Sequence, residues 1–123
     1  MKQAVLLVGH GSKLKGSDEA IKRVAEALNR IEPETFVQTA FLDIQSPDIQ
    51  EGIQICLHQG ADEVIVIPYF VQTGRHVVKD IPDLVSQAKS RFPSKRILLG
   101  GYLGFDERMV SIVREKVNQA RKG

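Results

Sequence analysis

Short apolar runs alternate along this chain with longer segments in which apolar residues recur every three or four positions. The short runs are rich in β-branched and aromatic residues, which favours buried strands. They predict strands at about residues 3–9, 35–42, 63–68 and 96–99. The longer segments have the spacing of amphipathic helices and predict helices at about residues 18–31, 47–59, 80–92 and 107–120. Four successive β-α units without a linker or repeat indicate one α/β domain over residues 1–123.

Strands that alternate with amphipathic helices favour a parallel sheet of four strands with helices on both faces. Right-handed crossovers restrict the possible connections, and a flavodoxin-like strand order 2-1-3-4 is expected. The last helix is expected to turn an inner face toward the rest of the domain, formed by Met109, Val110, Ile112, Val113 and Val117. The tail at residues 121–123 is expected to fray.

Residues that favour helix ends mark the boundaries of these helices. Ser17 is the expected N-cap of the first helix, and Pro33 closes it. Ser46-Pro47 resembles an N-cap followed by proline at the first helical position, and Gly60 is the expected stop of the second helix. Asp106 is the expected cap of the last helix.

A histidine follows each of two predicted buried strands. His10 lies in Gly9-His10-Gly11-Ser12 after the first strand, and His76 ends Gly74-Arg75-His76 after the third. In the order 2-1-3-4 these strands are neighbours, and ligands of open α/β sheets bind beyond the carboxyl ends of the strands. Two imidazoles brought together there can hold a metal ion or move a proton.

The number and type of the candidate ligands, two histidine imidazoles, limit the kind of metal site that they can form. Two histidines are too few for a closed structural zinc site, so an open site that holds a metal briefly is expected. Neutral imidazole suits cobalt, iron, nickel and zinc. Other interpretations stay open from spacing alone: His10 is a bystander in a glycine turn, the glycine-rich loop binds phosphate, or His76 is an ordinary loop histidine.

Other polar residues are weaker candidates. The basic side chains that can pair with an anionic substrate near the histidines are Lys13, Lys15, Arg75 and Lys79, with Arg75 preferred because of its place beside His76. Asp43, after the second strand, can bind metal, orient a histidine or simply solvate its loop. His58 is expected to be a surface or capping residue near a helix end, and Cys56 a core residue.

Composition excludes several classes of protein. Charged residues make up 26% and hydrophobic residues 42% of the 123 residues, which is ordinary for a globular domain. A net charge of +2 does not indicate a nucleic-acid binder, and no apolar run approaches the roughly 20 residues that span a bilayer. The single cysteine fits a reducing compartment, and Met1-Lys2-Gln3 leads directly into a strand. A cytoplasmic protein without a signal peptide is expected.

Four motifs together resemble the class II chelatases of the sirohydrochlorin cobaltochelatase and ferrochelatase group. The similarity covers essentially the whole chain, and the combined pattern is specific, whereas His-Gly-Ser alone is weak. The motifs are Val8-Gly9-His10-Gly11-Ser12, Phe41-Leu42-Asp43 with Ser46-Pro47, the stretch Pro68-Tyr69-Phe70 through Gly74-Arg75-His76 to Asp80-Ile81-Pro82, and Gly101-Tyr102-Leu103-Gly104.

The resemblance implies insertion of a divalent metal into sirohydrochlorin, in cobalamin or sirohaem synthesis. His10 and His76 match the family's metal-binding histidines, and His10 also matches its proposed proton acceptor. The residues that match positions lining the tetrapyrrole site are Ser46, Val71, Gln72, Thr73, Gly74, Arg75 and His76. Asp43 stands where many relatives have Glu, and the His-rich segment of some short archaeal members is absent.

The resemblance to short, single-domain members also implies a homodimer, with the tetrapyrrole between or beside the subunits. It implies no cofactor beyond the divalent metal substrate, which is Co²⁺, Fe²⁺ or Ni²⁺. The main alternative is a non-catalytic carrier that binds metal or tetrapyrrole with the same residues. A phosphate-binding α/β domain is a weaker third interpretation.

Overall fold

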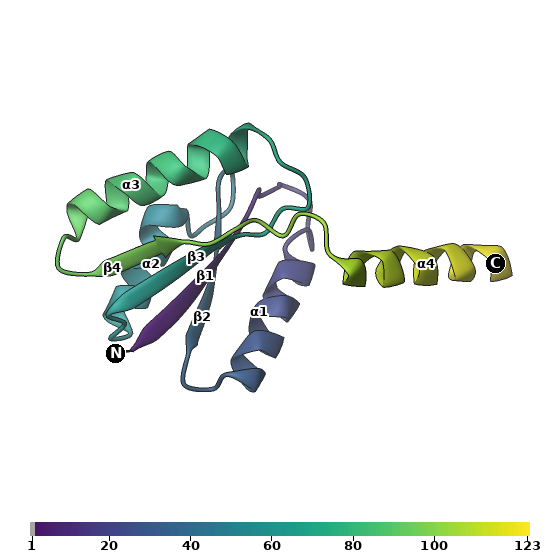
Figure 1. Cartoon of the computed structure of the whole chain (residues 1–123), viewed down its shortest axis with the longest axis horizontal. Coiled ribbons are helices and arrows are strands. Elements are labelled where there is room, and N and C mark those ends of the chain that lie inside the picture. The colour runs from purple at the N-terminus through teal and green to yellow at the C-terminus, as the bar shows by residue number, and fades with distance from the viewer. Residues whose placement is uncertain (1) are drawn as a thin grey trace.

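A computed structural model describes residues 2–123 and contains one parallel sheet of four strands. The strands are β1 (Gln3–Gly9), β2 (Phe36–Phe41), β3 (Glu63–Pro68) and β4 (Arg96–Leu99). Their order across the sheet is β2-β1-β3-β4, so the predicted topology is confirmed (Figure 1). Val8 of β1 lies opposite both Ala40 and Pro68, which brings the carboxyl ends of three strands to one edge.

Helices lie on both faces of the sheet, as predicted. They are α1 (Glu19–Ile31), α2 (Ile49–His58), α3 (Ile81–Arg91) and α4 (Glu107–Lys122), and a single π-helical turn, η1 (His76–Asp80), leads into α3. Helices α2 and α3 pack on one face and α1 packs on the other (Figure 1). No helix within residues 2–123 has both the length and the apolar character needed to cross a bilayer.

Alternation along the strands divides the core between the two faces. Leu6 and Val8 face α2 and α3 and are fully buried, whereas Leu7 packs with Ile21 of α1. Cys56 of α2 is fully buried as predicted, and burial raises the pKa of its thiol to about 12. A thiol with this pKa stays protonated near neutral pH, and Cys56 packs as a core residue.

Two predicted helix starts are too early, the first by one residue and the second by two. The first helix begins at Glu19 with Asp18, not Ser17, at its N-cap position, although the Asp18 side chain makes no capping bond. The second begins at Ile49, after a cis Ser46-Pro47 peptide bond.

The second helix starts late for a physical reason. The Pro47 carbonyl accepts the Phe41 N–H at 2.9 Å, so this proline still lies against the end of β2. Asp48 and Glu51 then form a capping box, in which each side chain accepts the other residue's backbone N–H. The box pairs the backbone N–H groups of both Asp48 and Glu51, which is why the helix is capped at Asp48 and not at Ser46.

The predicted packing of the last helix is wrong within this chain. Helix α4 extends away from the sheet, and none of its residues is buried (Figure 1). The predicted inner face is exposed to a large degree, with Val113 61% and Ile112 54% accessible. The helix persists to Lys122 rather than fraying at Arg121, with the Asp106 side chain accepting the Arg108 N–H at its start.

The direction of α4 is set by the segment that precedes it. After β4, the chain runs beside the loop that leaves β3, where the Gly104 N–H donates to the Phe70 carbonyl at 3.3 Å. The chain then departs from the domain. As a result, the α1-side face of β3 and β4 keeps three partly exposed apolar residues, Ile65, Ile67 and Leu98.

Candidate active site

The topology brings the two strand-exit histidines into contact. His10 follows the last residue of β1, and His76 opens η1 at the end of the loop that leaves β3. Their ring centroids lie 4.9 Å apart and the rings meet edge to face at 67°. Phe70 lies next to His76, with ring centroids 6.3 Å apart and ring planes tilted by 33°. The structure therefore places both imidazoles in one site.

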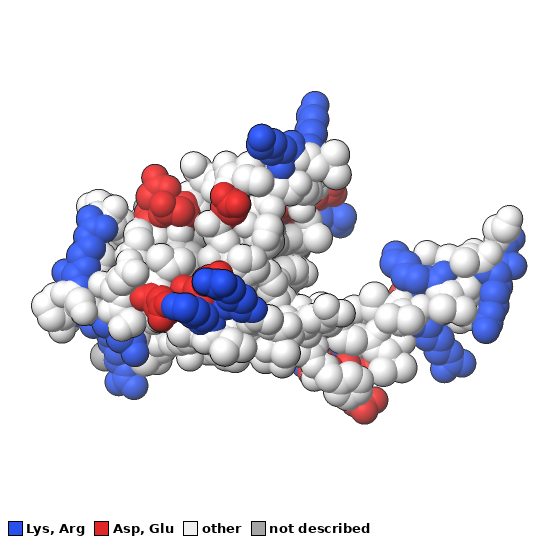
Figure 2. Space-filling model, turned by 90° about the horizontal axis from the view of Figure 1, so that it is seen from above, with Lys and Arg blue, Asp and Glu red and all other residues white. Residues whose placement is uncertain are grey.

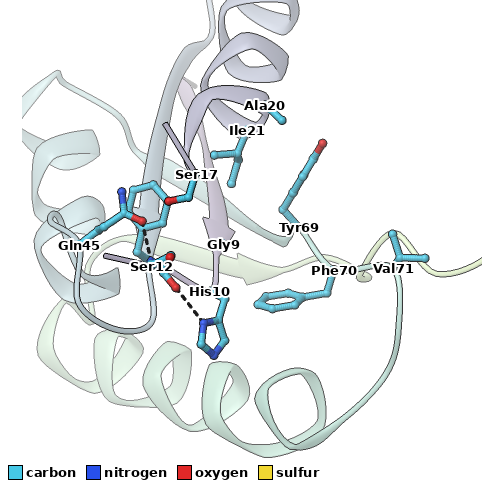
Figure 3. A pocket seen from close by; sticks show the side chains of 12 residues that line it. Gly9, His10, Ser12, Ser17, Ala20, Ile21, Gln45, Tyr69, Phe70 and Val71 are labelled. Atoms are coloured by element: carbon cyan, nitrogen blue, oxygen red, sulfur yellow. Dashed lines mark hydrogen bonds between the residues drawn. The ribbon is translucent and has the colours of Figure 1, made fainter. Parts of the chain in front are cut away.

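Each histidine is anchored through Nδ1. His10 Nδ1 lies 3.0 Å from the Gly11 carbonyl oxygen (Figure 3), and His76 Nδ1 lies 2.8 Å from Asp80 Oδ2. A carbonyl oxygen can only accept, so Nδ1 of neutral His10 carries the proton. Nε2 of His10 is then left with a free lone pair, which can bind a metal or accept a proton.

The loop that carries His10 is held against the loop that leaves β2. The Asp43 N–H donates to the His10 carbonyl at 3.0 Å, and the Gln45 side chain accepts the Ser12 N–H at 2.8 Å (Figure 3). Gly11 has φ +98°, and a Cβ there would lie 1.9 Å from the Asp43 carbonyl oxygen. Only glycine allows this contact. Because the Ser12 N–H is already paired, the loop offers fewer donors for phosphate than its composition suggests.

Three hollows surround the histidine pair. One of about 400 Å³ lies between His10, α1 and Tyr69 (Figure 3). A second, of about 420 Å³, runs from His10 along the loop after β3 to Val77. The third, of about 370 Å³, borders His76 and contains the carboxylates of Asp43, Asp80 and Asp83. The pair is thus open to solvent from several sides.

The residues predicted to bind substrate lie mainly in the loop after β3. Val71 to Arg75 are all exposed, and they line the second hollow together with both histidines. Ser46 is exposed in the loop after β2, beside Gln45. The role of these residues in binding stays a prediction.

The remaining candidates divide into near and distant ones. Asp43 is exposed and borders the third hollow, on the side of His76. The Lys79 ammonium donates a hydrogen bond to Asp83 at 2.8 Å, and this partner raises the pKa of Lys79. The charge of Lys79 is therefore already paired with a carboxylate one turn further along the chain. Lys13 and Lys15 are exposed in the loop after β1. His58 is exposed at the end of α2, just before the amino end of β3, as predicted for a surface residue.

Exposed apolar side chains occur near the site, in the loops at the carboxyl edge of the sheet and in η1, namely Leu14, Ile44, Val71 and Val78. Of these, only Val71 lines a hollow at the histidine pair, and it was named from the family resemblance. Periodicity carries no information in loops, so it did not indicate the others. Asp80, in contrast, stands four residues after His76, a spacing at which side chains of one helix meet.

Within residues 2–123, no three side chains of His, Cys, Asp or Glu are arranged to hold a metal ion. The two imidazoles alone would leave most coordination positions of a bound metal to other ligands.

The chain is similar to known proteins over nearly its whole length. The chain is 35% identical over 117 residues to the sirohydrochlorin ferrochelatase of Bacillus subtilis, which covers 95% of this chain and 45% of that protein. It is 34% identical over 116 residues to the sirohydrochlorin cobaltochelatase of Sulfolobus acidocaldarius, covering 94% of this chain and 90% of that protein. This chain thus spans about half the length of the Bacillus relative.

A solved chelatase structure also matches this chain over nearly its whole length. The sirohydrochlorin chelatase SirB from Bacillus subtilis subspecies spizizenii, in complex with cobalt, superposes with a TM-score of 0.86 at 37% identity. The match covers 97% of this chain and 51% of that one. The CbiX family model matches residues 4–120. The chain therefore belongs to the CbiX family.

Proposed function

We propose that this protein is a metal chelatase that inserts Co²⁺ or Fe²⁺ into sirohydrochlorin, in cobalamin or sirohaem synthesis. The observation that carries the proposal is the pair of His10 and His76, with ring centroids 4.9 Å apart at the adjacent ends of β1 and β3. Relatives matched over nearly all of this chain carry the names sirohydrochlorin ferrochelatase and cobaltochelatase.

The chemistry of metal insertion fits these residues. Two pyrrole N–H protons must leave the macrocycle, and the metal must exchange its previous ligands for ring nitrogens. In the proposed mechanism, His10 and His76 hold the ion against one face of the ring. The free Nε2 of His10 then accepts a ring proton, as an imidazole can do near neutral pH.

Substrate binding is proposed for the loop after β3 and for Ser46. Val71 and the neighbouring exposed apolar side chains provide contact for the flat macrocycle. Arg75 is 78% exposed and lies 3.7 Å from Asp80, so its guanidinium remains available to a substrate carboxylate. Gln72, Thr73 and Gly74 line the same hollow.

The function is tested by mixing the purified protein with sirohydrochlorin and Co²⁺, or anaerobically with Fe²⁺. Absorption spectra follow metallation against a protein-free blank. We expect accelerated metallation over many turnovers. Stoichiometric binding without acceleration would instead support a carrier of metal or tetrapyrrole.

We also propose that the protein is a homodimer in which two copies exchange α4. Figure 2 shows α4 standing clear of the body with Lys and Arg side chains gathered on it. Its apolar residues recur at helical spacing and form one stripe that has no partner among residues 2–123, made of Met109, Val110, Ile112, Val113 and Val117.

The same chain leaves a place for such a helix. Helix α1 packs on β2 and β1, so the neighbouring half of that face keeps Ile65, Ile67 and Leu98 partly exposed. When two copies exchange helices around a twofold axis, α4 of each copy covers the exposed half of the sheet face of the other. Burial of both surfaces is favourable by about 25 cal/mol for each Å² of apolar area.

Replacing Val113 with Asp should convert the dimer to a monomer, because the change places a carboxylate in the middle of the buried stripe. Ser111→Asp adds the same charge two residues away, on the polar face, and should leave the dimer intact. Light scattering coupled to gel filtration measures the mass. A monomeric wild type, or a dimeric Val113→Asp variant, would contradict helix exchange.

We further propose that the protein works in the cytoplasm and needs no resident cofactor, since the divalent metal is a substrate. The only cysteine, Cys56, is a buried free thiol, which suits a reducing compartment. Localisation of a tagged protein and metal analysis of the purified protein check both statements.

A further inference from the structure

Asp80 makes a direct bond to one of the two histidines. Its Oδ2 lies 2.8 Å from His76 Nδ1, and the two side chains are 33% and 44% exposed. Its other oxygen, Oδ1, lies 3.7 Å from Arg75 Nε. The carboxylate is thus shared between the imidazole at close range and the guanidinium at longer range.

The local fold explains why Asp80 reaches His76. The chain makes a π-helical turn from His76 to Asp80, in which the Ile81 N–H donates to the His76 carbonyl. Residues four apart lie on the same side of such a turn, so the side chain of Asp80 returns to the imidazole. Single π-turns are often found at functional sites.

The carboxylate of Asp80 has no structural task in α3. Asp80 occupies the N-cap position of this helix, but its side chain makes no capping hydrogen bond. The acidic residue in the first turn of α3 is Asp83, which bonds Lys79. A role of Asp80 in helix capping therefore does not account for its bond to His76.

We infer that Asp80 is a positioning residue for metal transfer, which holds His76 with Nδ1 protonated and Nε2 free for the metal. A carboxylate only accepts, so Nδ1–H of His76 donates to it and the lone pair of neutral His76 lies on Nε2. His10 obtains the same tautomer from the Gly11 carbonyl. One histidine is thus oriented by the backbone and the other by a replaceable side chain.

This inference rests on the proposed function, because it takes His76 as a metal ligand. Carboxylates commonly orient metal-binding histidines, and removing such a partner typically costs 10- to 100-fold in metal affinity or activity. The Asp80–His76 bond supplies the orientation here, and the ring cannot rotate away without breaking it. Metal affinity and the tautomer of His76 should both depend on Asp80.

The test uses Asp80→Ala and Asp80→Asn, with Glu34→Gln as a control that removes an exposed carboxylate just before β2, at the opposite edge of the sheet. Co²⁺ titrations followed by visible absorption give the affinity, and long-range ¹H–¹⁵N NMR of the histidines gives the tautomer. We expect Asp80→Ala to weaken Co²⁺ binding about 10- to 100-fold and to remove the Nδ1–H signature of His76. Asp80→Asn keeps an accepting oxygen and should restore part of both, while Glu34→Gln should match the wild type.

Two outcomes separate this inference from the proposed function. If Asp80→Ala binds Co²⁺ like the wild type and keeps the His76 tautomer, Asp80 is not a positioning residue. If His76→Ala itself leaves Co²⁺ binding unchanged, the proposed ligand assignment fails, and the positioning role in metal transfer fails with it, whatever the NMR spectrum shows. Circular dichroism and melting of each variant establish that it is folded.

Discussion

Replacing His10 with Ala should lower the rate of metal insertion by about 10²- to 10⁴-fold, the range that a positioned proton acceptor contributes. His10 Nε2 is free because Nδ1 bonds the Gly11 carbonyl, and alanine offers no substitute. His76→Ala should also slow metal insertion when Co²⁺ is limiting, because one ligand to the metal is lost. Initial rates with varied Co²⁺ and sirohydrochlorin separate the two roles. His10→Ala loses a ligand and the proton acceptor, so a fall in kcat together with a rise in KM for metal is expected. His76→Ala loses a ligand alone and should mainly raise KM for metal.

The matched control for both variants is His58→Ala. His58 is exposed at the end of α2, away from the carboxyl edge of the sheet, so its removal should leave the rate unchanged. Full activity of both His10→Ala and His76→Ala would contradict the assignment of the site. Loss of activity in His58→Ala alone would point to a different site.

Gly11→Ala should destabilise the protein and inactivate it together. The added Cβ would lie 1.9 Å from the Asp43 carbonyl oxygen, far closer than real Cβ contacts, and the residue would keep φ near +98°. Positive φ alone lowers the free energy of unfolding by about 1–3 kcal/mol for a non-glycine residue. The clash would also force the loop after β1 away from the loop after β2. His10 is adjacent, so its contact with His76 should be lost as well. Urea denaturation and the metallation assay measure the two effects.

Gly16→Ala is the control for this variant. Gly16 also has positive φ, +82°, but a Cβ there meets no atom within 4 Å. Gly16→Ala should therefore lose only the stability that positive φ costs an alanine, and it should keep its activity. The difference between the variants therefore isolates the Gly11–Asp43 contact. Equal stability of the two variants would contradict the claim that this contact fixes the loop.

Much of the site's location follows from sequence because strand exits can be read from apolar patterns. The runs ending at Gly9 and Pro68 place His10 and the loop of His76 at the ends of β1 and β3. The order of the strands then makes the exits neighbours. Helix starts were less certain, since several residues able to cap lie within two positions of each other. The Asp48 box decided one start through a contact with Glu51.

The sequence by itself determined the four β-α units, the two faces of the core and the residue types at the strand exits, because each depends on local periodicity. Only the tertiary structure decided the 4.9 Å separation of the imidazoles and the contact of Gly11 with Asp43, which join segments distant in the chain. It also decided the course of α4. An amphipathic stripe such as that around Val113 shows that a helix seeks an apolar partner, but the partner's identity depends on surfaces elsewhere.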